Sequence, residues 1–327
     1  MKAWQVRSYG EPEEVLELAE VPRPEPGPGQ LLVRVLAAAA NFPDVLLCRG
    51  TYQVRPPLPF TPGVELCGEV AGTGPGVTGF AAGDRVIGGA ALPSGGFAEY
   101  ALVDAALTFP VPEGLDDAEA APFLLTYQTG WFGLYRRARL AAGETLLVHA
   151  AAGGVGSGAV QLGKAAGARV IAVVGGAQKV RLAEQLGADV VVDRYEEDFV
   201  PVVKEVTNGK GANVVYDPVG GDSFRKSTKC IAFEGRIVVV GFASGDIPSA
   251  ALNHALVKNY DILGLHWGLY RERNPAAIVH CQAELTRLAV AGLIRPLISE
   301  RLPLADLPDG LRRLGAGTTV GRLVFLP

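Results

Sequence analysis

Short apolar runs separated by turns dominate the first third of the chain. Leu31–Leu36 and Glu69–Ala71 are runs of β type, and the Pro/Gly-dense residues 22–29 favour turns between strands. This pattern predicts a compact, mostly antiparallel β domain. A helical pattern then begins near Asp116 and continues to Ala138, and we place the first domain boundary within it, after residue 125.

A different rhythm follows residue 144, where six apolar runs of strand length alternate with amphipathic helical segments. Val, Ile and Leu fill these runs almost continuously, as in strands that are buried on both faces, and the connections are long enough for crossover helices. The pattern predicts an α/β, doubly wound parallel sheet of six strands, the Rossmann arrangement that binds dinucleotides. The predicted strands are Thr145–His149, Ala168–Val174, Asp189–Val192, Asn213–Tyr216, Arg236–Val240 and Asp261–Leu265.

The rhythm ends after Leu265. A helix is predicted over Pro275–Ala291 and a final strand over Gly321–Leu326, and we expect both to return to the first domain. The predicted organisation is therefore 1–125 for the β domain, 126–265 for the Rossmann domain and 266–327 for the return.

Length and charge narrow the class of protein. A chain of 327 residues exceeds the roughly 250–300 residues at which single cores stop growing, which agrees with two domains. A net charge of −4 gives no general attraction to nucleic acid or to an anionic membrane. The chain begins without the pattern of a signal peptide, and no apolar run approaches the ~20 residues that span a bilayer, so we expect a cytoplasmic protein.

The cysteines are not spaced as metal ligands. There is no Cys-x-x-Cys pair and no histidine at ligand spacing, so we expect four small buried side chains in a reducing compartment and no metal site. They are Cys48, Cys67, Cys230 and Cys281.

A glycine-rich turn follows the first predicted Rossmann strand. Ala151 stands where the dinucleotide fingerprint usually has its first glycine, while Gly153 and Gly156 keep the other two places, and a helix follows. We expect the backbone of Gly153, Gly154, Val155 and Gly156 to hold a pyrophosphate at the start of that helix.

The next strand indicates which nicotinamide cofactor binds. NAD-preferring folds carry an acidic residue about 20 residues beyond the loop, but this strand ends in Val174-Gly175-Gly176-Ala177. Lys179 and Arg194 follow two strand ends and can bind a 2′-phosphate, which predicts NADPH. The alternative for both is an ordinary solvated side chain. Arg181 is a weaker candidate, because Glu184 beside it favours an ion pair.

Segments along the whole chain resemble the zinc-independent quinone oxidoreductases of the medium-chain dehydrogenase/reductase superfamily. The resemblance implies a GroES-like β domain built from both ends of the chain, a Rossmann domain between them, an active site in the intervening cleft, and a homodimer. The matching segments are Asn41–Asp44, Arg49–Tyr52, Pro62–Glu65, Gly83–Val86, Gly95–Tyr100, His149–Gly156, Tyr216–Gly221 and the strand from Gly321.

The resemblance also implies that both zinc sites of related dehydrogenases are missing. Zinc-dependent relatives have Gly-His-Glu where this chain has Gly63-Val64-Glu65, and a valine cannot bind metal. The short link from Gly88 to Ser94 lacks the cysteines of their structural zinc lobe.

Asn41 and Tyr52 are the catalytic residues that the resemblance implies, as donors to the carbonyl oxygen that gains charge during hydride transfer. Asn41 could instead bond local backbone at a turn, and Tyr52 could simply pack beneath a proline-rich loop. By the same resemblance the cofactor would also contact Thr129, Gly220, Phe242 and Ser244. Phe242 could equally be a core aromatic, and Ser244 could merely cap a turn.

Two departures from the family concern the cofactor phosphates. Arg194 stands where a tyrosine is usual, and the basic residue expected near Thr318 is absent, with Arg322 the nearest. We assign no catalytic role to His149 or His266, because a lone histidine is more often structural.

Three functions fit these residues. The first is NADPH-dependent reduction of a quinone, a small conjugated acceptor. The second is NADPH-dependent reduction of an activated C=C bond in an enal, enone or enoyl thioester, which needs the same site and a proton donor. The third is an NADPH-binding structural or RNA-associated protein, although the acidic balance opposes RNA as the main partner.

Overall fold

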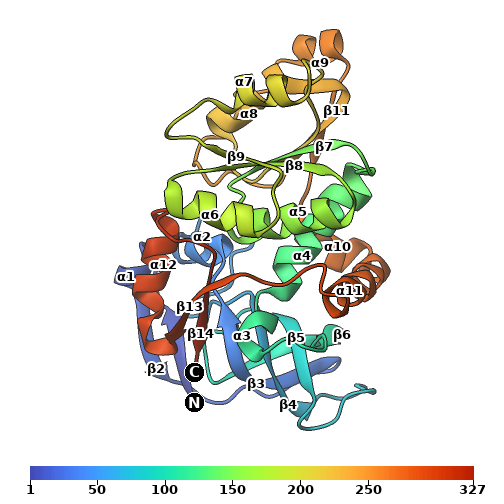
Figure 1. The fold of residues 1–327 in the computed structure, drawn as a ribbon. Helices are drawn as coiled ribbons and strands as arrows, with labels where there is room; N and C mark the ends of the chain where they lie inside the picture. The colour runs from blue at the N-terminus through green and yellow to red at the C-terminus, as the bar shows by residue number, and fades with distance from the viewer. The chain divides into compact units, whose positions relative to one another are not determined.

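The computed structural model describes residues 1–327, and the chain forms two compact units (Figure 1). The first unit comprises Met1–Leu125 and Arg295–Pro327, and the second comprises Thr126–Ile294. The chain thus returns to the first unit at Arg295 and not at residue 266, which corrects the predicted division.

The physical reason for this difference is the packing of two helices that follow the last Rossmann strand. Helices α10 (Trp267–Arg273) and α11 (Pro275–Val290) contact α4 (Phe123–Trp131). From these helices, Trp267 and Gln282 both bond to Gln128, at 3.0 Å and 2.9 Å. Polar and aromatic contacts within the second unit therefore hold a segment that the sequence pattern assigned to the first domain.

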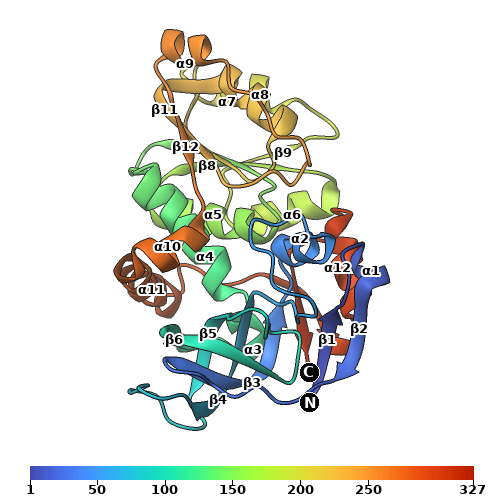
Figure 2. The same cartoon turned by 180° about the vertical axis from the view of Figure 1, so that it is seen from behind.

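The first unit contains a mostly antiparallel sheet of six strands, in the order β13-β14-β3-β4-β5-β6. An additional pairing of β3 with β6 closes four of these strands on themselves, so that β3 to β6 have no free edge. Figure 2 shows these strands and the small β1-β2 sheet from behind. The elements of the unit are β1 (Lys2–Val6), α1 (Pro12–Val15), β2 (Leu16–Glu20), β3 (Gln30–Ala39), α2 (Phe42–Arg49), β4 (Glu65–Thr73), β5 (Arg85–Ala90), β6 (Tyr100–Pro110), α3 (Asp117–Ala120), β13 (Ile298–Pro303), η2 (Leu304–Asp306), α12 (Leu307–Gly315) and β14 (Arg322–Leu326).

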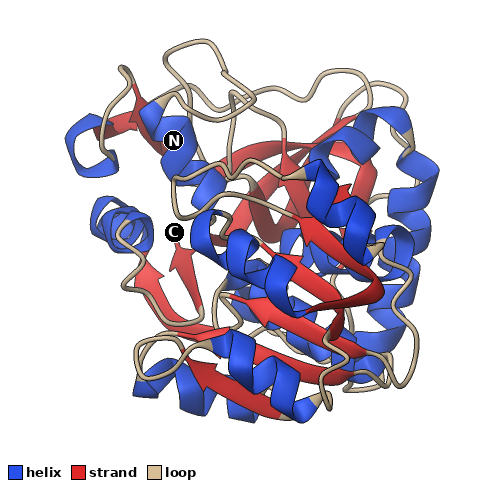
Figure 3. Cartoon of the chain, turned by 90° about the horizontal axis from the view of Figure 1, so that it is seen from above, coloured by secondary structure: helices blue, strands red, loops and turns tan.

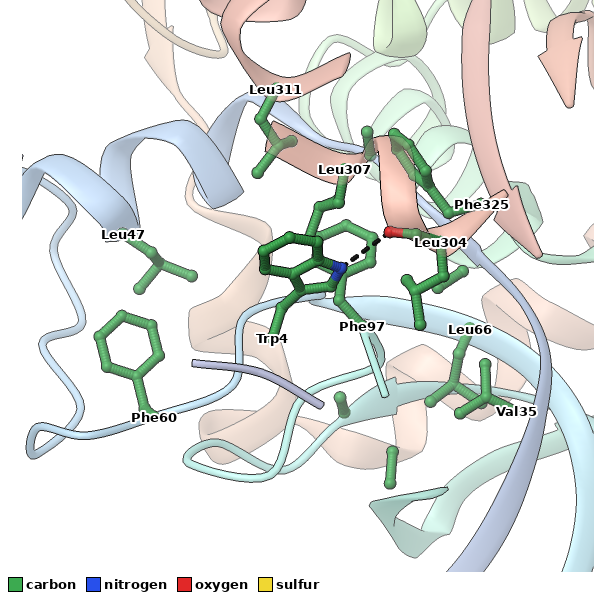
Figure 4. Packing of buried hydrophobic residues seen from close by; sticks show 14 of the residues in the cluster. Trp4, Val35, Leu47, Phe60, Leu66, Phe97, Leu304, Leu307, Leu311 and Phe325 are labelled. Atoms are coloured by element: carbon green, nitrogen blue, oxygen red, sulfur yellow. Dashed lines mark hydrogen bonds between the residues drawn. The ribbon is translucent and has the colours of Figure 1, made fainter. Parts of the chain in front are cut away.

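A shared core explains why both ends of the chain join this unit. The Trp4 indole donates from Nε1 to the carbonyl of Leu304 at 2.7 Å, and Phe97 meets Phe325 edge to face at 5.7 Å (Figure 4). All four side chains are at least nine-tenths buried. Burial of large aromatic rings contributes several kcal/mol, on the order of 1.5–3 for each large side chain.

The second unit is a parallel sheet of six strands in the order β12-β11-β10-β7-β8-β9. This order is that of the Rossmann fold, and it confirms the predicted fold class. Figure 3 shows strands bordered by helices, as crossover connections require. The remaining elements are the π-helix η1 (Phe132–Arg137), β7 (Thr145–His149), α5 (Gly154–Ala165), β8 (Arg169–Val174), α6 (Ala177–Gln185), β9 (Val190–Asp193), α7 (Phe199–Val206), β10 (Ala212–Asp217), α8 (Gly221–Cys230), β11 (Ile231–Val239), α9 (Leu252–Lys258) and β12 (Asp261–Gly264).

Candidate active site and cofactor site

The glycine turn after β7 brings the start of α5 close to the backbone at the end of the strand. A Cβ on Gly156 would lie 2.2 Å from the carbonyl oxygen of Ala150, which no side chain tolerates. Ala150 takes the left-handed conformation at φ 49°, so the tight turn needs no glycine at Ala151. The first intrahelical bond of α5 runs from Ser157 N to Gly153 O, so the preceding amides of Gly154 to Gly156 lie ahead of it. These features fit a bound pyrophosphate.

A basic cluster lies at the carboxyl ends of β8 and β9. Arg194 donates from Nη2 to the Tyr195 hydroxyl at 3.2 Å and lies 5.1 Å from the centre of its ring. Partial burial lowers the pKa of Lys179, the tyrosine raises it, and the arginine charge lowers it further, so all three side chains are close enough to interact. The Asp193 carboxylate accepts the amides of Gly176 and Tyr195 and fixes the two loops.

Tyr195 is the residue that the sequence reasoning missed. We expected Arg194 to replace a tyrosine, but Tyr195 is the next residue and its side chain is 68% exposed. A Cβ on Gly175 would lie 3.0 Å from the ring of Tyr195, so the glycine leaves room for this ring. The sequence did contain a signal for Tyr195: it comes directly after Arg194 in the loop that follows the predicted strand, so both side chains could reach the same cofactor phosphate.

The ends of β10 and β11 bring together three of the predicted cofactor residues. Gly220 has φ 71°, and a Cβ there would lie 2.8 Å from the ring of Phe242. Ser244 donates from Oγ to the Val219 carbonyl at 2.7 Å, and the Asp217 carboxylate accepts the amides of Val219 and Gly220. A hollow of about 280 Å³ is lined partly by Gly220 and Ser244. Phe242 is 38% exposed and is thus not a core aromatic.

Thr129 lies on α4 and is buried, with 6% of its surface exposed. One turn earlier, Thr126 packs closely against Gly158 of α5, where a Cβ would come within 2.8 Å of the threonine methyl group. The helix that carries Thr129 is thereby held against the helix that follows the glycine turn.

In the first unit, Asn41 belongs to a buried polar cluster. Its amide Nδ2 donates to Glu65 Oε1 at 2.9 Å and to the Ala39 carbonyl at 3.1 Å, and its Oδ1 accepts from Arg322 Nη1 at 2.9 Å. Arg322 also forms an ion pair with Glu65, and all three side chains are at least 95% buried. Both amide hydrogens of Asn41 are therefore donated within the protein.

Arg322 consequently has a structural role. In sequence it is the basic residue nearest to Thr318, where the family has a basic phosphate contact, but its side chain is 5% exposed and pairs with Glu65. A buried pair is worth little relative to an apolar pair, yet the loss of one partner costs about 3–5 kcal/mol because the other charge stays buried. The pair joins β14, at the end of the chain, to the start of β4.

Asp44 ties the start of α2 to the loop before β4. Its carboxylate accepts the amides of Asn41, Gly63 and Val64 at 2.8–3.1 Å while it is fully buried. Burial dominates over these bonds and raises the pKa of Asp44 to about 7, and the Glu65 charge adds to the rise. Burial also raises the pKa of Glu65 itself.

Tyr52 follows α2 and packs half-buried against the core of the first unit. Burial, and secondarily the charge of Asp44, raises the pKa of the Tyr52 phenol, so its hydroxyl keeps its proton at neutral pH. Its hydroxyl makes no hydrogen bond within the protein. Tyr52 therefore offers a neutral hydroxyl that can donate a hydrogen bond, close to the carboxylate of Asp44.

Neither histidine nor cysteine supplies an obvious catalytic or metal group. His149 is buried, its Nε2 bonds to Ser227 Oγ at 2.8 Å, and burial lowers its pKa. His266 precedes α10 without a side-chain cap bond. All four thiols are buried and free, as expected, and burial raises the pKa of Cys48 to about 12. No group of three or more His, Cys, Asp and Glu side chains is arranged to hold a metal ion.

Comparison with known proteins identifies the class. Residues 27–113 match the alcohol dehydrogenase GroES-like domain, and residues 154–282 match the zinc-binding dehydrogenase family. A GroES-like β domain with a Rossmann sheet defines an oxidoreductase of the medium-chain dehydrogenase/reductase superfamily. None of the helices combines the length and the apolar character that a membrane span requires.

Individual relatives identify the family within this superfamily. A quinone oxidoreductase-like protein 2 homolog of Nematostella vectensis is 41% identical over 302 residues, covering 91% of this chain and 82% of the relative. The structure of Escherichia coli quinone oxidoreductase complexed with NADPH superimposes with a TM-score of 0.92 at 32% identity, covering 100% of both chains. The chain belongs to the quinone oxidoreductase family, and the predicted family is confirmed.

A third relative is a much larger protein. A mycocerosic acid synthase-like polyketide synthase of Mycobacterium tuberculosis is 34% identical over 323 residues, which is 98% of this chain but 15% of the synthase. The chain therefore resembles one segment of that enzyme.

Proposed function

We propose that the chain transfers a hydride from NADPH to a quinone and needs no zinc ion. The observation that carries this proposal is the cluster of Lys179, Arg194 and Tyr195 at two strand ends where no acidic residue follows β8. Two cations and a phenol suit a 2′-phosphate, whereas a carboxylate would suit a free ribose hydroxyl. The NADPH that occupies the E. coli relative supports this assignment.

Most of the predicted cofactor residues lie in loops that follow strands of the Rossmann sheet, whereas Thr129 lies on α4. The loops after β7, β8, β10 and β11 all follow the carboxyl ends of parallel strands, so they lie at the same end of the sheet. We propose that Gly153 to Gly156 hold the pyrophosphate, and that Thr129, Gly220, Phe242 and Ser244 contact the remainder of the cofactor. When bound, NADPH supplies the hydride.

Tyr52 is our candidate for the catalytic donor. Hydride addition to a quinone places negative charge on a carbonyl oxygen, which a neutral hydroxyl stabilises by donating a hydrogen bond. The raised pKa of Tyr52 keeps that proton in place. Asn41 has no amide hydrogen left to donate, so we propose that it positions the site by fixing the start of α2 and the Glu65–Arg322 pair.

The proposed independence from zinc rests on side-chain chemistry at the position of the metal ligand. Val64 presents an apolar side chain there, and Glu65 is committed to Arg322, Asn41 and the amide of Leu125. Val64 and Glu65 therefore do not help to provide the three protein ligands that a catalytic zinc ion requires.

The decisive experiment measures NADPH oxidation with a panel of quinones before and after treatment with a strong chelator. We expect equal rates and no stoichiometric zinc by elemental analysis. We expect Tyr52→Phe to lower kcat by about 10- to 100-fold with little change in NADPH affinity, because one donor to the developing charge is lost. Zinc-dependent turnover, or NADPH binding without oxidation by any acceptor, would overturn the proposal.

The second candidate is reduction of an activated C=C bond. The 34% identity over 323 residues to one segment of a polyketide synthase favours it. This reduction would use the same hydride donor together with a proton donor for the adjacent carbon. The comparison of kcat/KM for quinones with that for enals, enones and an enoyl thioester separates the two functions.

We also propose a homodimer located in the cytoplasm. Helix α9 has no buried residue, and Leu252, Leu256 and Val257 on it are each at least 75% exposed. The neighbouring strand β12 is an edge strand of the sheet, with a free set of backbone donors and acceptors. A second copy, related by a twofold axis, would pair this edge and cover the apolar side chains. Four buried free thiols suit a reducing compartment.

A further inference from the structure

A cavity of about 340 Å³ opens at the end of the Rossmann sheet where β10 and β11 begin, whereas the glycine turn lies at the other end of the strands. It is lined by residues at the amino ends of β10 and β11 and at the carboxyl ends of three helices, so it lies away from the loops assigned to the cofactor. Figures 1 and 2 both show α7, α8 and β11 side by side in this region. The lining residues are Lys204, Gly209, Gly211, Lys229, Cys230, Ile231, Phe233 and Lys258.

Three ammonium groups converge on this cavity, and no acidic residue lines it. The charge of Lys204 lowers the pKa of Lys258, which is also partly buried, so these two cations lie within interaction range. Neither Lys204 nor Lys229 forms an ion pair in the structure. Asp198 is the acidic group close enough to interact with Lys229, and its carboxylate is bonded to Lys226 at 3.0 Å. No ion pair in the structure thus neutralises Lys204 or Lys229, although Asp198 is close enough to act on the lining residue Cys230 as well.

Helix ends explain only part of this charge. Lysines commonly occupy the last turn of a helix, where the partial charge is about −0.5. The three helices that end here would offset about half of the +3 charge of the lysines. Lys258 does bond to a terminal carbonyl, that of Thr228, at 2.8 Å. Lys204 and Lys229 make no such bond and remain available to an external anion.

An exposed aromatic ring stands at the rim of the same cavity. Phe233 is 69% exposed because the register of β11 against β10 shifts between Ala212 and Val214, and the chain bulges. Glu234 within the bulge takes a left-handed conformation at φ 54°, which is costly for a residue other than glycine. Bulges often re-aim a side chain, and here one places a ring beside three cations.

We propose that this cavity binds a phosphorylated small molecule that carries a planar ring, at a site separate from the cofactor site. The phosphates bind Lys204, Lys229 and Lys258 by charge-assisted hydrogen bonds, and the ring stacks on Phe233. Gly209 and Gly211, both at positive φ, leave the wall of the cavity free of side chains.

The test is calorimetric titration of the NADPH-saturated protein with tripolyphosphate and with ATP as probes. We expect saturable binding of both, tighter for ATP, and weaker at higher ionic strength. The double variant Lys204→Gln/Lys229→Gln should weaken both probes by about tenfold or more, because two charge-assisted contacts are lost. Phe233→Ala should remove the advantage of ATP over tripolyphosphate.

Two controls separate this site from its alternatives. Lys210→Gln removes a charge from the same loop without altering the lining, and it should leave both affinities within about twofold. Lys179→Ala, at the proposed 2′-phosphate site, should leave ATP binding unchanged. Absence of saturable binding at millimolar probe, equal effects of the lining and control lysines, or loss of ATP binding in Lys179→Ala would overturn the inference.

Discussion

At the scale of single residues, the site depends on groups whose surroundings change their chemistry. Asp44 and Glu65 are carboxyl groups with raised pKa values in the interior of the first unit, while Tyr52 keeps its proton because of burial and a nearby carboxylate. The pKa of Lys179 is lowered first by partial burial and then by the charge of Arg194, while Tyr195 raises it.

Replacement of Lys179 tests the choice of cofactor. We expect Lys179→Ala to weaken NADPH by about tenfold or more and NADH far less, because only NADPH offers a 2′-phosphate to the ammonium group. Fluorescence titration with both nucleotides measures the two losses. Arg181→Ala on the same helix is the matched control and should change neither affinity by more than about twofold. Equal losses for both nucleotides in Lys179→Ala would remove this residue from the 2′-phosphate site.

The buried Asp44 makes stability depend on pH. Its pKa is about 7 in the folded protein and near 4 when unfolded, so the folded state binds the proton more tightly. The contribution of Asp44 to the free energy of unfolding is therefore greatest below pH 4 and is lost as the pH rises from about 4 to 7.

Chemical denaturation between pH 4.5 and 8 measures this effect. Asp44→Asn cannot titrate, so the stability difference between wild type and variant should shrink by roughly 2–4 kcal/mol towards the alkaline end. The variant will be less stable at acid pH, because its amide opposes the N–H of Asn41. A difference that stays constant with pH would show that Asp44 ionises normally.

At the scale of elements, close approach between pairs of segments decides the architecture. Because Gly156 has no side chain, α5 can start close to the backbone at the end of β7. In the same way, Gly310 lets α12 pack closely against β14. In the second case a Cβ would lie 2.4 Å from the ring of Phe325, which also meets Phe97 in the core. The return of the chain to the first unit therefore needs glycine on one face of α12.

Gly310→Ala should destabilise the protein by about 1–3 kcal/mol although alanine favours helix, because the added methyl group forces α12 away from Phe325. Thermal unfolding measures the change. Arg312→Ala lies on the same helix with an exposed side chain, and we expect its effect to stay within about 0.5 kcal/mol. Stabilisation by Gly310→Ala would show that the ring moves aside at no cost.

At the scale of the whole molecule, the chain passes twice between its units, after Leu125 and after Ile294. The second unit carries both an open edge strand and an uncovered apolar helix. Large side chains exposed together on a short helix mark an interaction surface more often than isolated ones do.

The double variant Leu252→Glu/Leu256→Glu tests the proposed dimer. Each side chain is 76% exposed in the single chain, so the fold should tolerate the change, whereas an interface between two copies would bury four like charges. Sedimentation velocity should show a dimer for the wild type and a monomer for the variant. The variant Val290→Glu is a control on a different exposed helix position, and it should remain dimeric.

The sequence by itself determined the fold class and the tight glycine turn after β7. Continuous apolar runs separated by helical patterns predict buried parallel strands wherever they occur, and five of the six strands lie within one residue of their predicted limits. The exception is β11, which begins at Ile231, five residues before its predicted start. The requirement for Gly156 is equally local, because a tight turn between a strand and a helix is set by backbone geometry. Lys179 and Arg194 were predicted as cofactor residues from their positions after strand ends, and the structure places them within interaction range of each other.

Tertiary structure decided what side chains far apart in sequence do together. Arg322 meets Asn41 and Glu65 only because β14 joins the sheet of the first unit, so no local pattern could show that Asn41 has no free amide hydrogen. The return point at Arg295, against the predicted residue 266, depends on the contacts of Gln128 with Trp267 and Gln282. Local backbone preferences extend over a few residues, whereas burial, pKa and pairing depend on every segment that packs against a group.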